Sequence, residues 1–412
     1  MKVIVDDEIV LSRPLEGPLA AHIAGFVKWA RDQGYARHSR YRQALLAACF
    51  SRWLGQQGVN ACGVSAEHQA RYLRSRAHHV QIHRGDGAAL GQFLDYVRCQ
   101  GVVPREKVPP CHLTPIEKVV RAFERYIRGE RALSEAAVVN YVPFVRKFLA
   151  DRFGNGPVRL SRLRAGDVVR FVRRQASRLH LKRAKLLTCA LRSFLHYARY
   201  RGYINCDLAA AVPTVANWSM TAIPRAIPVD AVRRLLASIN RHTSTGRRDY
   251  AILLLLDRLG LRAGEITRLE LDDINWNAGS LRIQGKGGQY SDLPLPADVG
   301  TAIASYLRHG RPQSSNRRVF LRARAPLRGF LSQSAIASLV RHALLRAGIS
   351  APTKGAHQFR HGLATAMLRH GASLVEIGEV LRHRNPQTTE IYAKVDLEAL
   401  RALALPWPGG VR

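Results

Sequence analysis

An internal repeat is the feature of this 412-residue chain that most constrains its fold. Residues 89–101 read ALGQFLDYVRCQG, and residues 190–202 read ALRSFLHYARYRG. In both copies the apolar residues follow helical spacing, and a glycine ends the helix. The recurring pairs are Leu90 and Leu191, Phe93 and Phe194, Leu94 and Leu195, Tyr96 and Tyr197, Arg98 and Arg199, and Gly101 and Gly202.

Amphipathic helices resemble one another in general, but here the matches fall at the same place in each unit. Upstream, FVKWARDQG at residues 26–34 resembles FERYIRGE at residues 123–130. We therefore predict two helical domains, over residues 1–110 and 111–212, that arose by duplication. Residues 213–228 are rich in proline without sustained periodicity, which predicts a linker. A third domain then covers residues 229–412.

The charge of the chain points to a polyanionic partner. Lys and Arg number 64 against 30 Asp and Glu, a formal net charge of +34, and 47% of the residues are hydrophobic. Such charge on a folded body repels itself, and nucleic acid is the partner that best neutralises it. A membrane surface is the competing interpretation, but no apolar run reaches transmembrane length. The beginning of the chain does not read as a secretion signal. We expect a cytoplasmic bacterial protein associated with the nucleoid.

Cysteines and histidines give no metal-binding pattern. None of the cysteines forms a CxxC pair, so we expect free, buried thiols in a reducing compartment. The histidine-rich stretch HHVQIH at residues 78–83 lacks Cys or acidic partners at ligand spacing, and we predict no metal and no cofactor. The six cysteines are Cys49, Cys62, Cys99, Cys111, Cys189 and Cys206.

The third domain opens with a buried helix followed by a basic helix entrance. Residues 250–276 read YAILLLLDRLGLRAGEITRLELDDINW, and Gly260 interrupts the apolar run. Arg262 and Glu265 then lie in the first turn of the next helix. Burying an arginine beside apolar residues is costly unless its charge meets a bound anion or a carboxylate side chain. By itself this pattern fits a salt bridge to Glu265 and a phosphate contact equally well.

A β-hairpin follows at residues 280–295, SLRIQGKGGQYSDLPL. Two alternating strands flank a Gly-Lys-Gly-Gly turn, which is a strong hairpin signal. Lys286 therefore lies at an exposed tip. A lone lysine there is usually a solubilising charge, so its role depends on the other residues of the domain.

Further polar residues come from the end of the chain. His357 and Arg360 in KGAHQFRHGLATAMLRHG are spaced i, i+3 at a helix entrance, so both can face one point. The next helix, at residues 373–383, begins with the capping-box residues Ser373 and Glu376 and ends at His383. After the turn RNPQ, a short helix beginning near position 388 is predicted to carry Tyr392.

Together these residues suit transesterification at a DNA phosphodiester. Fixed guanidinium groups stabilise the charge that gathers on the non-bridging oxygens in the transition state. A lysine protonates the leaving 5′ oxygen, and a tyrosine forms a phosphodiester that is readily reversed without ATP. The chain also lacks the acidic cluster of a two-metal nuclease.

With this set of residues, the chain resembles the tyrosine recombinases, also called the phage integrase family. The resemblance rests on LGLRAGEI, QGKGG, HQFRHGLAT and LRHRNPQTTEIY, which occur in order within residues 229–395. It implies an α+β fold class, mainly α with a small β-sheet in the catalytic domain. It also implies that residues 111–212 form a helical, SAM-like core-binding domain, of which residues 1–110 would be a second example.

The same resemblance implies roles for individual residues. Arg262 and Arg360 would clamp the scissile phosphate, and Lys286 would be the general acid. The resemblance further assigns proton transfer to His357, a phosphate hydrogen bond to His383, the 3′-phosphotyrosine to Tyr392 and support of the site to Glu265.

The chain departs from the family pattern in several places. Arg382 stands where the family usually has glycine, and QYSD follows the hairpin lysine in place of further basic residues. The family's extra N-terminal domain is typically small and partly β, whereas residues 1–110 read as helical, which suits a longer grip on DNA in a transposon-encoded member. Residues 395–410 place leucines on one helical face, either packed on their own domain or exchanged between protomers.

The function expected from the sequence is site-specific DNA recombination by a homotetramer, with accessory recombinases or directionality factors as further partners. A type IB topoisomerase shares the phosphotyrosine chemistry and is the nearest alternative. A DNA-binding accessory protein with a relict site is the alternative from another class. An RNA partner fits the charge but not the residue set.

Overall fold

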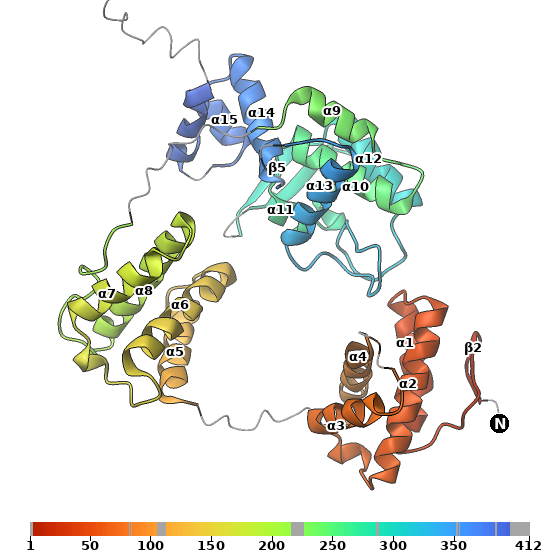
Figure 1. Cartoon of the computed structure of the whole chain (residues 1–412). Coiled ribbons are helices and arrows are strands. Elements are labelled where there is room, and N and C mark those ends of the chain that lie inside the picture. The colour runs from red at the N-terminus through yellow and green to blue at the C-terminus, as the bar shows by residue number, and fades with distance from the viewer. Residues whose placement is uncertain are drawn as a thin grey trace, which may run out of the picture. The chain divides into compact units, whose positions relative to one another are not determined.

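The computed structural model describes residues 3–81, 83, 85–104, 113–215, 226–285, 288–351, 353, 355–383 and 385–395. Residues 107–221 form one compact unit, and residues 1–106 and 222–412 are grouped in the other. Figure 1 shows helices throughout the chain and only short strands. The expected class, mainly α with small antiparallel sheets, is confirmed.

The first part of the chain, residues 3–104, begins with a two-stranded antiparallel hairpin that the sequence pattern did not predict. Four α-helices follow, and their apolar faces enclose one core. The elements are β1 Val3–Asp6, β2 Ile9–Leu11, η1 Ala20–His22, α1 Ile23–Asp32, α2 Arg37–Gln56, η2 Ala61–Gly63, α3 Ala66–Ala77 and α4 Asp86–Cys99.

Residues 113–215 repeat this helical order without the hairpin. The hydroxyl of Thr114 accepts a hydrogen bond from the backbone N–H of Glu117 at 3.2 Å, and this caps the first helix. The elements are α5 Pro115–Arg125, a π-helical turn η3 Tyr126–Glu130, α6 Glu135–Phe153, η4 Leu160–Arg162, α7 Ala165–Ala176 and α8 Leu181–Tyr200.

The two helical parts share the packing of their aromatic residues. Phe26 contacts Phe93 at 5.1 Å and Tyr96 at 5.8 Å between ring centroids, all within the first part. The corresponding Phe123 contacts Phe194 at 5.4 Å and Tyr197 at 5.5 Å. The helices that carry the repeated sequence, α4 and α8, are both followed by a glycine with positive φ, Gly101 at 74° and Gly202 at 70°.

The last part, residues 226–395, surrounds the apolar helix α10, which packs against α9, α11, α12 and α14. Thr243 caps α10 by accepting a hydrogen bond from Gly246 N–H at 3.0 Å. The main elements are α9 Val229–Ala237, α10 Ser244–Arg258, α11 Ala263–Arg268, α12 Ala297–His309, α13 Ser334–Arg346, α14 His357–Arg369 and α15 Leu374–Val380. Its short elements, apart from the hairpin described next, are η5 Leu271–Asp273, β3 Ile274–Asn275, η6 Pro386–Thr388 and η7 Glu390–Val395.

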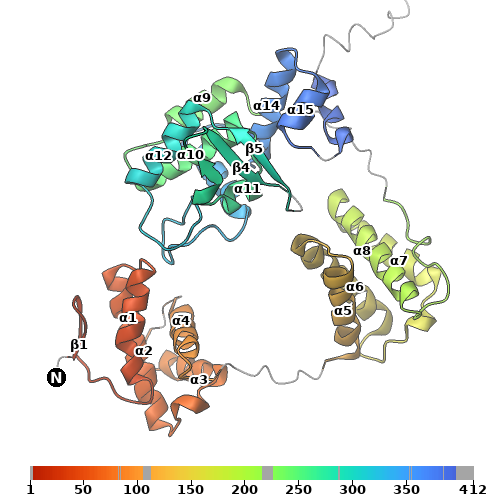
Figure 2. The same ribbon diagram turned by 180° about the vertical axis from the view of Figure 1, so that it is seen from behind.

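The predicted hairpin is present as β4 Ser280–Gln284 and β5 Tyr290–Pro294, in a sheet of order β3-β4-β5. Figure 2 shows this sheet beside α11. Leu281 pairs with Leu293, and Ile283 pairs with Ser291. Leu281 and Ile283 are fully buried, as the alternation of the strand requires.

The expected burial of the cysteines is wrong. Among the described cysteines, Cys62, Cys99 and Cys206 are exposed, and Cys49 and Cys189 are half-buried. Cys62 lies in the short helix η2, Cys99 ends α4 and Cys206 lies in the irregular segment after α8, whereas Cys49 and Cys189 lie at the margin of a helix's buried face. The short helix expected after the RNPQ turn is present as the 3₁₀ helix η7, and it carries Tyr392.

Candidate functional site

Arg262 and Glu265 form the first corner of the site, at the beginning of α11. Gly260, with φ of 55°, ends the run of α10 and turns the chain into Arg262. Glu265 accepts hydrogen bonds from the Arg262 backbone N–H and from Arg262 Nη1, both at 2.8 Å. The salt bridge that the sequence allowed is therefore present. It fixes the guanidinium of Arg262, which stays about one-third exposed (34%).

Arg360 comes from α14 and is almost fully buried. Its Nη1 donates to the Gly260 carbonyl at 2.8 Å, and its Nη2 donates to the Leu381 carbonyl. Burial and the charges of Arg262 and Arg382 lower the pKa of Arg360 to about 9. Buried beside other cations, this guanidinium favours an anion nearby.

Both arginines reach the turn that follows α15. Arg262 Nη2 donates to the carbonyl of Arg382 at 3.3 Å, next to the Leu381 carbonyl that Arg360 holds. His383 follows in this turn, and its Nδ1 lies 2.7 Å from Thr389 Oγ1. Burial, followed by the charges of Arg360 and Arg262, lowers the pKa of His383 to about 4. Three segments far apart in the sequence thus converge on one point.

His357 begins α14 and stays largely exposed. Partial desolvation, Arg360 and Arg262 lower its pKa, so the neutral ring dominates at neutral pH. Of the two residues that the i, i+3 spacing placed together, His357 is exposed at the beginning of α14 and Arg360 is buried one turn later. The His357 ring also meets the ring of His361 edge-on, with 4.6 Å between centroids.

Tyr392 lies beside this histidine pair. Its side chain is 2% exposed, within a small apolar cluster formed by α14, α15 and η7. Burial raises the pKa of Tyr392 to about 12, although Arg360 and Arg262 act in the opposite direction. The ring of His383 lies parallel to it at 6.5 Å between centroids. The Tyr392 hydroxyl, however, lies 2.9 Å from Nδ1 of His361.

Sequence reasoning missed His361 and left Arg382 without a role. His361 directly follows Arg360 in HQFRHGLAT, and its position one turn beyond His357 was the available signal. Arg382 has φ of 56°, a conformation that favours glycine. Its Nη2 donates to Glu265 Oε2 at 3.1 Å, so Glu265 lies between two arginines.

Two predicted features lie outside the described residues. The first is Lys286, at the hairpin tip. On either side of the tip the strands are joined by a hydrogen bond from Gly285 N–H to the Gln289 carbonyl at 2.7 Å. Most of the C-terminal segment, residues 396–412, is the other. The catalytic assignment of Lys286 and the packing of the tail stay predictions.

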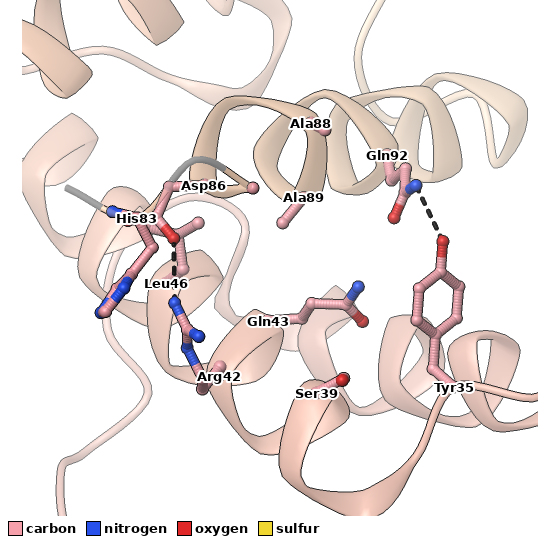
Figure 3. A pocket seen from close by; sticks show the side chains of 11 residues that line it. Tyr35, Ser39, Arg42, Gln43, Leu46, His83, Asp86, Ala88, Ala89 and Gln92 are labelled. Atoms are coloured by element: carbon pink, nitrogen blue, oxygen red, sulfur yellow. Dashed lines mark hydrogen bonds and ion pairs between the residues drawn. The ribbon is translucent and has the colours of Figure 1, made fainter. Parts of the chain in front are cut away.

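A polar pocket lies elsewhere, in residues 3–104. Figure 3 shows Arg42 and Gln43 of α2 facing Asp86 and Gln92 of α4. Arg42 forms an ion pair with Asp86 at 3.4 Å, and Gln92 donates to the Tyr35 hydroxyl at 2.9 Å. The pocket contains none of the predicted catalytic residues.

The described ranges hold neither a metal-binding cluster nor a membrane-spanning helix. Within them, no group of three or more His, Cys, Asp or Glu side chains is arranged to hold a metal ion. No helix described there combines the length and apolar character needed to cross a membrane.

Comparisons with known proteins match both the site and the domain before it. The phage integrase family model matches residues 225–398, which include every predicted catalytic residue. The model of the phage integrase N-terminal SAM-like domain matches residues 120–202. An integrase/recombinase of Sinorhizobium fredii, y4rA, is 55% identical over 409 residues, which cover 99% of each chain.

More distant relatives agree. The tyrosine recombinase XerD of Listeria monocytogenes is 28% identical and aligns with 67% of this chain and 94% of its own. In fold, the chain is similar to the XerH site-specific recombinase in a post-cleavage complex, with a TM-score of 0.55, 19% identity, and coverage of 76% of this chain and 93% of that one. A lambda integrase dimer bound to a core site has a TM-score of 0.52 at 14% identity and covers 76% and 87% of the two chains. The chain belongs to the phage integrase family, and it is a tyrosine-type site-specific recombinase.

Proposed function

We propose that Tyr392 is the nucleophile with which this recombinase cleaves and rejoins DNA. The Tyr392 hydroxyl oxygen attacks the scissile phosphorus, loses its proton, and forms a 3′-phosphotyrosine while the bond to the 5′ oxygen breaks. Lys286 gives a proton to that leaving oxygen. In the rejoining step a 5′-hydroxyl attacks the phosphotyrosine and releases Tyr392, so the energy of the phosphodiester is conserved.

The observation that carries this proposal is the convergence of Arg262 and Arg360 on the turn at residues 381–383. The two guanidinium groups are placed by different helices, and each uses only some of its N–H donors in hydrogen bonds to backbone carbonyls. Glu265 is the carboxylate that pairs with Arg262, and its charge does not balance the local cations. A phosphate bound here would gain from fixed, partly dehydrated guanidinium groups, which are worth most where charge develops in the transition state.

Two histidines complete the proposed phosphate site. His383 extends from the same turn and would donate a hydrogen bond to a non-bridging oxygen. His357, exposed at the entrance of α14, would assist proton transfer. Glu265 supports the site by fixing Arg262, which is why its substitution should act through Arg262 and not on the phosphate directly.

The test is covalent trapping on nicked duplex DNA, in which the strand released by cleavage diffuses away. The site is first mapped by sequencing the DNA ends that wild-type protein carries as a covalent adduct. Wild type should accumulate a protein–DNA adduct, and Tyr392→Phe should form none while binding the same DNA. The exposed Tyr203, with 46% of its surface accessible, provides the control variant Tyr203→Phe. An adduct of undiminished yield with Tyr392→Phe would refute the assignment.

We further propose that four protomers assemble on two double-stranded DNA sites, assisted by accessory recombinases or directionality factors. Exchange between two duplexes needs four cleavages, whereas relaxation of a supercoiled plasmid by one protomer needs a single one. Joined recombinant products in a two-plasmid assay support the tetramer. Plasmid relaxation by a monomer, without exchange, would support a topoisomerase instead.

Residues 1–110 are proposed to be a duplicate of the core-binding domain at 111–212 that lengthens the grip on DNA. The equivalent aromatic contacts of Phe26 and Phe123 support this, as do the equivalent glycines after α4 and α8. The β1–β2 hairpin has no counterpart among the described residues of the second copy and is an addition at the start of the first.

A further inference from the structure

The polar partner of the Tyr392 hydroxyl is a histidine outside the set that the sequence indicated. His361 Nδ1 lies 2.9 Å from Tyr392 Oη, which is hydrogen-bonding distance. The two rings meet at 61° with 5.6 Å between centroids, an arrangement in which one ring presents its edge. His361 is half-buried on α14, while Tyr392 is carried by η7, so tertiary packing creates the contact.

The hydroxyl needs such a contact because its surroundings oppose ionisation. Tyr392 packs against Ala364, Ile377 and Leu381, all of them fully buried. This burial raises the pKa of the phenol to about 12, so free phenolate is rare at neutral pH. A nucleophilic tyrosine in this pocket therefore requires a base that takes the proton as the bond to phosphorus forms.

His361 has the protonation state that a base needs. Burial, followed by the positive influence of His357 and Arg360, lowers its pKa to about 4. The ring is therefore neutral at neutral pH, and one nitrogen is free to accept a proton. In the DNA-free protein, transfer from Tyr392 is strongly uphill. An anionic phosphate beside Arg360 and Arg262 would offset their charge and favour the protonated imidazole, which couples the transfer to the presence of substrate.

We propose that His361 is a catalytic residue that accepts the Tyr392 proton during cleavage and returns it during rejoining. The proposal rests on Tyr392 being the nucleophile. During cleavage the O–H bond of Tyr392 breaks, its proton moves to His361 Nδ1, the oxygen bonds to phosphorus and the 5′ oxygen departs with a proton from Lys286. During rejoining a 5′-hydroxyl gives its proton to Lys286 and its oxygen bonds to phosphorus, while the tyrosine oxygen leaves phosphorus and recovers its proton from His361.

The other two histidines are less well placed to do this. His383 Nδ1 contacts Thr389 Oγ1 at 2.7 Å, and its ring lies parallel to the tyrosine ring at a larger separation. His357 contacts the ring of His361, which itself meets the hydroxyl. His357 can influence the charge of His361, and its assistance in proton transfer would then be indirect.

The experiment compares two reactions at the same phosphate site, of which only the first requires Tyr392 to lose its proton. The first is adduct formation on the nicked duplex, in which Tyr392 must lose a proton. The second is ligation of a DNA end that carries a 3′-p-nitrophenyl phosphate. There a 5′-hydroxyl displaces p-nitrophenolate at the same arginines, and no tyrosine takes part. A misfolded variant loses both reactions.

We expect His361→Gln to slow adduct formation by roughly 10²- to 10⁴-fold, the usual contribution of a positioned base. Ligation of the p-nitrophenyl end should stay within about threefold of wild type, because it tests only the phosphate site. His361→Ala should likewise slow adduct formation and keep ligation, and added imidazole should restore part of its rate of adduct formation. His370→Gln is the matched control, since His370 lies exposed at the end of the same helix.

Each result has a distinct meaning. Cleavage at the wild-type rate by His361→Gln, with Tyr392→Phe inactive, overturns the role of His361 and leaves the proposed function intact. Equal loss of both reactions in the His361 variants, without imidazole rescue, also overturns it in favour of a structural role. An adduct formed by Tyr392→Phe refutes the nucleophile itself.

Discussion

Arg382 combines an unfavourable backbone with a favourable side-chain contact. A left-handed conformation costs a residue with a Cβ atom about 1–2 kcal/mol relative to its ordinary conformations, and Arg382 adopts it with φ of 56°. In return its guanidinium, 11% exposed, pairs with the buried carboxylate of Glu265. Burial alone would raise the pKa of Glu265, but Arg382 and the hydrogen bonds from Arg262 lower it below its usual value.

Substituting Arg382 separates these two effects. Arg382→Ala keeps the strained backbone and removes the ion pair, whereas Arg382→Gly removes both. We expect the glycine variant to be more stable than the alanine variant by about 1 kcal/mol in urea-induced unfolding. Equal stability of the two variants would contradict the left-handed conformation.

The pH dependence of cleavage should also change. The folded pKa of Glu265 is depressed, so its ionised pairing with Arg262 is present above the ordinary carboxyl range and disappears as pH falls through the lowered value. Without Arg382 that pKa rises. The acidic limb of the pH–rate profile for cleavage should therefore move to higher pH in Arg382→Gly. In Arg382→Lys it should lie closer to that of wild type. An unchanged limb would show that Arg262 suffices to keep Glu265 ionised.

Helices with equivalent aromatic contacts allow a test at the scale of the element. Phe26 of α1 and Phe123 of α5 are both completely buried. Replacing either by alanine should destabilise its own helical part by about 3–5 kcal/mol, the usual cost of such a truncation. Calorimetry combined with limited proteolysis would show which part unfolds early. Val139→Ala, at a residue 62% exposed on α6, is the control.

The sequence predicted elements best where a local signal existed. The β4–β5 hairpin followed from its glycine turn, and the capping box of Ser373 and Glu376 is present as predicted. The β1–β2 hairpin was missed because three- and four-residue strands carry too little periodicity.

The candidate site was predicted in its residues but not in its contacts. Motif order indicated Arg262, Arg360 and Tyr392, and the structure brings the two arginines to one turn. Spacing along the chain did not reveal that the tyrosine hydroxyl meets His361, because that contact depends on how η7 packs on α14. Long-range packing of this kind leaves no periodic trace in one sequence.

At the scale of the whole molecule, the net charge of +34 makes DNA binding depend strongly on salt concentration. Phosphate contacts release counterions, so the logarithm of the binding constant should fall linearly with the logarithm of salt concentration, by about 0.9 for each phosphate neutralised. Non-specific binding should follow the same law, because it uses the same cations. Much of the affinity at low salt is therefore independent of the target sequence.

The proposed longer grip predicts how this salt dependence changes when residues 1–110 are removed. If these residues bind DNA beside the core-binding domain, the truncated protein should protect a shorter stretch and show a shallower salt slope. The slope should decrease by about 0.9 for every phosphate that the truncated protein no longer neutralises. Footprinting and fluorescence anisotropy at several salt concentrations measure both quantities.

Because the matched family models begin at residue 120, the truncated protein should still form the covalent adduct on its mapped site at low salt. Equal footprints and equal slopes would instead assign residues 1–110 to contacts with other proteins.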